Sequence, residues 1–307
     1  MSSWPVLVFD IESIPDVAGL RNLRQMDTSV DDAAVYDAEI ADRAARGKGD
    51  FMPLYLQRVL VISCVFRNAE GLRVHSLVDR ETGGTSQEGR VIQSFFNLIE
   101  RHEPQLVSWN GSGFDLPVLH YRGMRHGVVA SKYWDMGDDD REYRYNNYIS
   151  RYHLRHLDLM DLMALYQPKA NAPLDAMAKL CGFPGKLGMD GSQVFGAYKE
   201  GRIDEIRRYC ETDVMNTYLL YCRFQQMRGG FSDVEYRREI AGVREMLGGL
   251  DEPHWREYLG AWPEEASAAA PAPAAPAAPV AVVSEDSQVL VRATVPASPP
   301  APLTGTD

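Results

Sequence analysis

Two acidic residues near the start of the chain have a spacing that suits metal binding. Asp10 ends the apolar run 5–10, whose composition predicts a buried strand, and Glu12 follows two positions later. Residues i and i+2 of a strand project from the same face of a sheet. Two carboxylates placed together in this way repel each other unless cations neutralise them. The pair is therefore a candidate cation site, although a strand end whose acids face solvent has the same pattern.

Two further segments carry acidic residues in related patterns. The segment from Asn110 to Asp115 follows the apolar run 105–109, and its glycines allow a tight turn before a helix that begins near Asp115. Tyr209 and Asp213 are four residues apart in a predicted long helix, so their side chains share one face. Each pattern also has a structural explanation, because an acid at a helix start interacts favourably with the helix dipole and a tyrosine packs well in a core.

Taken together, the three segments resemble the DEDD, or DnaQ-like, superfamily of 3′→5′ exonucleases, which has a ribonuclease-H-like fold. The chain resembles the tyrosine branch of that superfamily (DEDDy), because Tyr209 precedes Asp213 and the position used by the histidine branch is Arg208. A closer resemblance is to predicted bacterial exonucleases related to the exonuclease domain of family B DNA polymerases. This closer resemblance rests on residues 9–16, 156–161 and 185–191.

The resemblance implies a function and a set of site residues. The activity would be metal-dependent removal of nucleotides from a 3′ end of DNA or RNA. In the family, acidic residues hold two divalent cations, and carboxylate oxygens suit Mg²⁺ or Mn²⁺. The matching positions are Asp10, Glu12, Asp115 and Asp213. The hydroxyl of Tyr209 would orient the attacking water, since a phenol with a pKa of about 10 is a poor base at neutral pH.

Residues beside the second acidic segment are candidates for substrate contacts. Trp109, Asn110 and Phe114 could contact the terminal nucleotide, because aromatic rings stack on bases. Buried packing explains the two aromatic residues equally well. Lys186, in the glycine-rich segment 182–191, could bind a phosphate, although an exposed loop lysine has the same pattern.

The order of predicted elements indicates an α/β fold with a mixed central sheet flanked by helices, and the resemblance implies that this sheet is ribonuclease-H-like. Apolar runs predict strands over 5–10, 59–66, 72–78 and 105–109. Helical periodicity and composition predict helices over 86–102, 115–126, 157–166, 174–181, 192–200 and 203–227. A further helix over 31–46 belongs to an insertion spanning about 16–57.

Three parts are expected in the chain. The resemblance implies that residues 1–230 form the exonuclease domain with its insertion, and residues 231–263 are predicted to be a C-terminal helical extension. Residues 264–307 are rich in alanine and proline, and such a segment buries too little apolar area to offset the entropy lost on ordering. We therefore predict a disordered tail. Its apolar run 287–291 is a strand, a docking peptide or, more simply, a mildly apolar stretch.

Bulk properties exclude several other classes of protein. The 307 residues carry a formal net charge of −11, which argues against a protein that coats nucleic acid through a basic face. No apolar run approaches the roughly 18 residues of a membrane helix, and the N-terminus does not resemble a signal peptide. The four cysteines form no C-x-x-C pair, which predicts reduced thiols and a cytoplasmic protein. His153 and His156 have no obvious third zinc ligand, and Asp158 and Asp161 are assigned no catalytic role.

Three other functions remain compatible with the sequence. The first is a non-catalytic nucleic-acid-binding module on the same fold, and the second is an endonuclease of the ribonuclease-H type. The third is a metal-dependent phosphodiesterase for small nucleotides, which fits the acidic composition. The predicted partner is a nucleic acid with a 3′ end. No membrane partner is expected, and the sequence specifies no protein partner.

Overall fold

The computed structural model describes residues 5–81 and 86–263. These residues belong to the first of two units into which the chain divides, residues 1–264. The predicted disordered tail over 264–307, with its apolar run 287–291, lies outside the described residues.

The centre of the fold is a five-stranded mixed sheet with the strand order β3-β2-β1-β4-β5. β2 pairs antiparallel with both β1 and β3, whereas β4 runs parallel to both β1 and β5. The strands are β1 (Val6–Pro15), β2 (Gln57–Asn68), β3 (Gly71–Val78), β4 (Gln105–Ser108) and β5 (His156–Asp158). The predicted α/β class with a mixed central sheet is confirmed.

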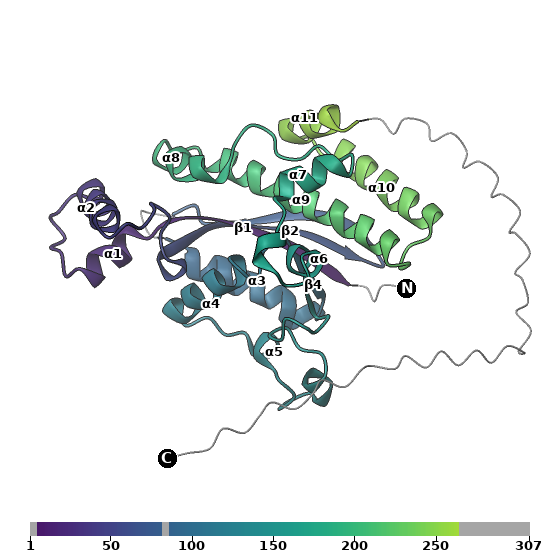
Figure 1. Ribbon diagram of the computed structural model, residues 1–307, viewed down its shortest axis with the longest axis horizontal. Coiled ribbons are helices and arrows are strands. Elements are labelled where there is room, and N and C mark those ends of the chain that lie inside the picture. The colour runs from purple at the N-terminus through teal and green to yellow at the C-terminus, as the bar shows by residue number, and fades with distance from the viewer. Residues whose placement is uncertain (1–4, 82–85, 264–307) are drawn as a thin grey trace, which may run out of the picture. The chain divides into compact units, whose positions relative to one another are not determined.

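Helices cover both faces of this sheet (Figure 1). α3, α4 and α5 share a hydrophobic core with one face, and α7, α8, α9, α10 and α11 lie on the other side. The helices are α1 (Val17–Leu23), α2 (Asp32–Ala45), α3 (Glu88–His102), α4 (Asp115–His126), α5 (Ser131–Trp134), α6 (Leu159–Met163), α7 (Leu174–Leu180), α8 (Val194–Lys199), α9 (Ile203–Met227), α10 (Asp233–Gly248) and α11 (Pro253–Ala261). Short 3-10 helices are η1 (Leu54–Leu56), η2 (Arg141–Arg144), η3 (Pro168–Ala170) and η4 (Gly191–Gln193).

β1 sends alternate side chains to the two faces of the sheet. Its odd-numbered residues from 7 to 11 pack in the core with α3 and α4, whereas Val6 and Val8 pack in the core with α9. Asp10 and Glu12 continue the second series along the same strand. The two carboxylates therefore project toward the α9 side, as their spacing predicts.

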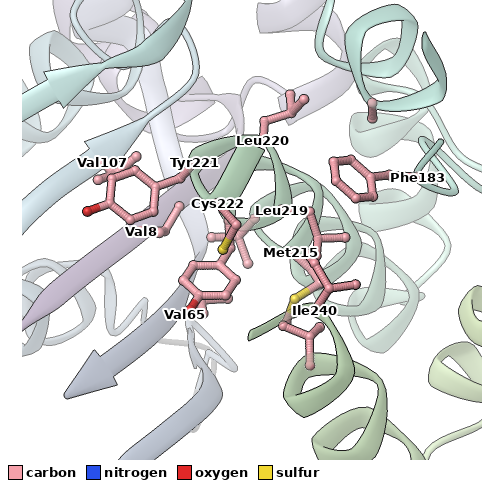
Figure 2. Close-up of a cluster of buried hydrophobic side chains, with 14 of the residues drawn as sticks. Val8, Val65, Val107, Phe183, Met215, Leu219, Leu220, Tyr221, Cys222 and Ile240 are labelled. Carbon is pink, nitrogen blue, oxygen red and sulfur yellow. The ribbon is translucent and has the colours of Figure 1, made fainter. Parts of the chain in front are cut away.

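α9 is the long predicted helix, and it packs across the sheet through an apolar stretch in its second half. Figure 2 shows valines of the sheet facing side chains of this helix, among them Val8, Val65, Val107, Leu219, Tyr221 and Cys222. Side chains of α10 and α11 complete the same core, including Ile240 and Trp255. Neither α9 nor any other helix in the described part of the chain is long and apolar enough to cross a membrane.

The connection from β1 to β2 is the predicted insertion. It contains α1, α2 and η1, and its small separate core is formed by Leu20, Val35, Met52 and Leu56. The two helices project beyond the end of β1 (Figure 1). Because this core is small, the insertion also needs contacts with the main domain to hold its position.

A buried arginine supplies such a contact. Arg122 of α4 is 1% exposed, and its NH1 group lies 2.5 Å from Asp16 Oδ2 at the start of the insertion. Its Nε and NH2 groups donate to Glu88 of α3 at 2.7 and 2.6 Å. Burial alone would raise the pKa of Glu88, but hydrogen bonds from His126 and Arg122 lower it to about 2. One guanidinium thus links α3, α4 and the insertion.

The predicted helix over 157–166 is wrong at its start. His156–Asp158 form the short edge strand β5, which pairs with β4, and only Leu159–Met163 are helical. The Asp158 side chain accepts from the backbone N–H of Asp161 and caps this short helix. A three-residue strand is too short for its periodicity to be recognised in the sequence, and its pairing partner is about 50 residues away in the chain.

Candidate active site

The candidate site lies where β1 extends past its parallel neighbour. β4 pairs with β1 only from Val6 to Val8, and the chain then leaves the sheet after Ser108. Beyond this point one edge of β1 is open, and its backbone groups need other partners. The Ile11 N–H donates to Asp115 Oδ1 at 3.0 Å. This hydrogen bond attaches the start of α4 to the strand between Asp10 and Glu12.

The turn before α4 explains how Asp115 reaches this position. Asn110 has a φ of 68°, a left-handed conformation in which asparagine is tolerated better than most residues. Its N–H donates to Asp158 Oδ1 at 2.9 Å, and the N–H of Ser112 donates to Asp158 Oδ2 at 2.8 Å. The carboxylate of Asp158 therefore holds the turn in place, which is a structural role.

Asp10 and Glu12 lie beside the N-terminal half of α9. Their carboxylate oxygens and the sulfur of Cys210 lie within 4.8 Å of one another. The Cys210 thiol donates to Asp10 Oδ2 at 3.5 Å. The sequence predicts only a reduced thiol for Cys210. The signal that it lies at the site is its position directly after Tyr209 in the same helix.

Tyr209 and Asp213 lie on the face of α9 that meets the two acids of β1. The ammonium of Lys186 lies 2.8 Å from Asp213 Oδ2 and also donates to the Tyr209 hydroxyl. Lys186 is half-buried beside the carboxylates, although its sequence context suggested an exposed loop lysine. The lysine is thus an additional site residue, and its only signal in the sequence was the glycine-rich segment that carries it.

The two carboxylates of β1 interact electrostatically with Asp115 and Asp213. Burial raises the pKa of Asp10 well above its usual range, and the charges of Asp115 and Asp213 raise it further. Burial also raises the pKa of Glu12, with added repulsion from Asp10, Asp213 and Asp115. The structure therefore brings together the acidic residues that the sequence places in three separate segments.

The other two acids are also held in a poorly solvated environment. Burial raises the pKa of Asp115 to about 7, although hydrogen bonds from backbone N–H groups act in the opposite direction. Burial raises the pKa of Asp213, and the neighbouring Lys186 only partly offsets this increase. In the described part of the chain, Asp213 Oδ1 is buried and has no hydrogen-bond partner.

This arrangement fits divalent cations. Several buried carboxylates without enough hydrogen-bond donors are stable only if they are protonated or paired with positive charge. The oxygen donors are hard ligands of the kind that Mg²⁺ and Mn²⁺ prefer. The unpartnered oxygen of Asp213 is a ready ligand atom, whereas the lysine supplies one positive charge to a group of four acids.

The surroundings of Tyr209 favour the neutral phenol over the phenolate that could act as a base. Its side chain is 4% exposed, and burial together with the nearby charges of Asp213 and Glu12 raises the pKa of the phenol well above its usual value. The phenol therefore stays protonated at neutral pH. A protonated hydroxyl can donate or accept a hydrogen bond but cannot remove a proton from water.

The candidate substrate contacts differ in their surroundings. Trp109 packs against the α9 core and donates through Nε1 to the carbonyl of Ala172 at 3.0 Å, so much of its ring is committed to packing. Asn110 is exposed, and Phe114 is half-buried with its ring centroid 5.8 Å from that of Phe51. A contact between any of these three residues and a nucleotide stays a prediction.

The two histidines that are close in sequence have separate environments. His153 accepts through Nδ1 from the Asn147 N–H at 3.0 Å, whereas His156 Nε2 lies 2.8 Å from Ser108 Oγ. Burial lowers the pKa of His156 to about 4. The two rings thus have separate roles in holding loops and strands.

The mixed sheet flanked by helices and the acidic residues gathered beside β1 are consistent with the class of the DnaQ-like exonucleases. The chain belongs to the family described as predicted 3'-5' exonuclease related to the exonuclease domain of PolB, whose sequence model matches residues 49–262. The match includes Asp115, Tyr209 and Asp213, and it ends in the region of α11. It begins after β1, so Asp10 and Glu12 lie outside the matched range. No curated protein matches the chain.

Proposed function

We propose that this chain is a metal-dependent 3′→5′ exonuclease that hydrolyses phosphodiester bonds from a 3′ end of DNA or RNA. Family membership supports the exonuclease activity and makes a nucleic acid the substrate. The observation that carries the metal dependence is the clustering of four carboxylates, three of them buried and each with a raised pKa, at the open edge of β1. The four free cysteines fit a reducing compartment such as the cytoplasm.

Asp10, Glu12, Asp115 and Asp213 would hold the cations. Two bound Mg²⁺ or Mn²⁺ ions supply an activated water and stabilise the leaving 3′ oxygen in an in-line displacement. The protein contributes a fixed cluster of ligands: Asp115 is attached to the backbone of β1 by its hydrogen bond from Ile11. The same backbone carries the first two acids, so a shift of α4 would disturb three ligands together.

Tyr209 and Lys186 would act on the substrate side of this cluster. The Tyr209 hydroxyl, kept protonated, orients the attacking water. Lys186 neutralises part of the charge of Asp213, and its ammonium is the group beside the cluster that would contact a phosphate oxygen. The present contact between the Lys186 ammonium and the Tyr209 hydroxyl keeps both groups beside the carboxylates.

A cleavage assay with matched variants tests this proposal. Oligonucleotides of DNA and RNA that carry a 5′ label should shorten stepwise from the 3′ end in Mg²⁺ or Mn²⁺, and EDTA should stop the reaction. Asp10→Ala and Asp213→Ala should abolish shortening. Asp251→Ala is the control, since this acid is 99% exposed and distant from the cluster in sequence. Metal-dependent shortening that persists in both site variants would defeat the proposal.

The same assay separates the other functions. A circular single strand lacks a 3′ end, so its cleavage would indicate an endonuclease. Binding of an oligonucleotide without any cleavage would indicate a non-catalytic module. Hydrolysis of small nucleotide diesters with no action on oligonucleotides would indicate a small-molecule phosphodiesterase.

A further inference from the structure

The last segment of the insertion runs beside α4, from the start of that helix toward its C-terminal half. Residues 49–56 leave α2, pass along α4 through η1 and enter β2. The segment is held by side chains at both ends. Arg43 donates to the carbonyls of Gly49 and Phe51 at 2.9 and 2.7 Å, and Gln57 donates to the carbonyl of Met52 at 3.0 Å. Its backbone position is therefore fixed by the fold.

This segment and α4 together expose several aromatic rings. Phe51 is 64% exposed and lies 5.8 Å from Phe114, measured between ring centroids. Tyr55 is 51% exposed and lies 6.4 Å from Tyr121, which is 50% exposed. We call these four residues the aromatic strip. Large aromatic side chains with this much exposure, on a well-held backbone, are typical of binding surfaces.

The aromatic strip begins at the carboxylate cluster. Phe114 directly precedes Asp115 in the chain, so the first pair of rings lies at the start of α4, the end of the helix that carries this candidate metal ligand. Tyr121 is seven residues after Phe114, which places it on the same face of α4 about 10 Å farther along the helix axis. The strip thus runs from the site where a 3′ end must enter to the outer part of the insertion.

The charge of the molecule favours stacking as the way to hold a nucleic acid here. A net charge of −11 does not supply a broad basic groove, and the nearby guanidinium of Arg125 is already paired with Asp16 at 2.7 Å. Base stacking on aromatic rings needs no positive charge and works with every base. It does need unpaired bases, because the faces of paired bases in a duplex are covered by their neighbours.

We propose that the aromatic strip binds the single-stranded segment that precedes the 3′ end of the substrate, so that the enzyme prefers unpaired 3′ ends. This proposal rests on the proposed exonuclease function. Phe114 was already a candidate contact for the terminal nucleotide. Phe51, Tyr55 and Tyr121 are the new binding residues, and they give the insertion a role in choosing the substrate.

The test compares long and short substrates in strip variants. Phe51→Ala, Tyr55→Ala and Tyr121→Ala should each raise KM for a 12-nucleotide oligo(dT) by about 5-fold or more, the effect expected for the loss of one stacked base. The kcat should stay unchanged in all three variants. KM for a dinucleotide should change less than 2-fold in Tyr55→Ala and Tyr121→Ala, because a dinucleotide is too short to reach these two rings. A blunt duplex should be degraded more slowly than the single strand.

Tyr145→Ala is the matched control. Tyr145 is 83% exposed and adjoins Asn146, whose side chain accepts from the backbone of Leu154 and Arg155 just before β5. It therefore lies near the start of the parallel strands, whereas the carboxylates lie beyond their other end. Its replacement should leave KM unchanged for every substrate.

Direct binding separates this proposal from the proposed function. In an Asp10→Ala background, fluorescence anisotropy with labelled oligo(dT) should show the same 5-fold or larger weakening in the strip variants, with only a small dependence on salt concentration. This measurement does not require cleavage, so it still tests the strip if no nuclease activity is found. Unchanged affinity and KM in all three variants would overturn the proposal. Sedimentation that shows a dimer lost in Phe51→Ala, with unchanged affinity for oligo(dT), would also overturn it and assign the strip to a second copy of the chain.

Discussion

The acidic cluster predicts that a substitution can stabilise the protein while abolishing its activity. Asp115→Asn keeps the shape of the side chain, and the amide oxygen can still accept from the Ile11 N–H. It removes a buried negative charge that repels its neighbours. In EDTA we therefore expect a more stable but inactive protein.

The size of the stabilisation expected for Asp115→Asn, and its dependence on pH, follow from the pKa of Asp115. Burial raises this pKa from 3.8 to about 7, so folding disfavours the ionised form. Below about pH 4 the group is protonated in both states, and the penalty is absent. It grows as the pH rises toward 7 and is complete above that value, reaching about 4 kcal/mol since one pKa unit corresponds to about 1.4 kcal/mol. At pH 5 the same group destabilises the fold by only about 2 kcal/mol.

Chemical denaturation in EDTA at pH 5 and pH 8 measures this difference. Asp115→Asn should unfold at higher denaturant concentration than the wild type at both values, with the larger gain at pH 8. The melting temperature at pH 8 should rise by roughly 8–16 °C, at about 2–4 °C per kcal/mol for a domain of this size. Asp251→Asn, at a 99% exposed acid, should change stability by less than about 0.5 kcal/mol. Equal or lower stability of Asp115→Asn at pH 8 would refute the reasoning.

Three further predictions concern other parts of the structure. Arg122→Met should destabilise the fold by about 3–5 kcal/mol in urea denaturation, because it removes the buried guanidinium that Asp16 and Glu88 share and leaves these acids only their contacts with Arg125 and His126; a loss below about 1 kcal/mol would contradict the buried ion-pair description. Tyr209→Phe should bind Mn²⁺ normally in calorimetry but lower kcat at least 10-fold, and an unchanged kcat would reject the water-orienting role. Lys186→Met should bind Mn²⁺ more tightly than the wild type while lowering kcat, and weaker Mn²⁺ binding would reject competition between the lysine and the cation.

The sequence predicted the parts of the site that depend on local periodicity. Asp10 and Glu12 share a side because a strand has a period of two, and Tyr209 and Asp213 share a side because a helix has a period of 3.6. The bounds of α9 follow from the same regularity. These features require knowledge of one element at a time, so a single sequence is sufficient to predict them.

The features that the sequence did not predict depend on pairing between distant segments. The edge strand β5 exists because His156 and its neighbours complete the open side of β4. Lys186 lies in a loop, and no periodicity indicates that this loop returns to Tyr209. The position of Phe51 beside Phe114 likewise depends on how an insertion of some 40 residues folds back. Long-range packing determines each of these, and local patterns do not report it.

The stiffness of α4 has a consequence for how enzymes of this kind can diversify. Asp115 begins α4, and Arg122 binds the insertion two turns later in the same helix. The rigid helix therefore fixes the distance between the candidate active site and the insertion. An insertion of another length or composition, if it retained an acid at the position of Asp16, would dock on the same guanidinium. Substrate preference could then evolve by exchange of this one segment, with no readjustment of the carboxylates.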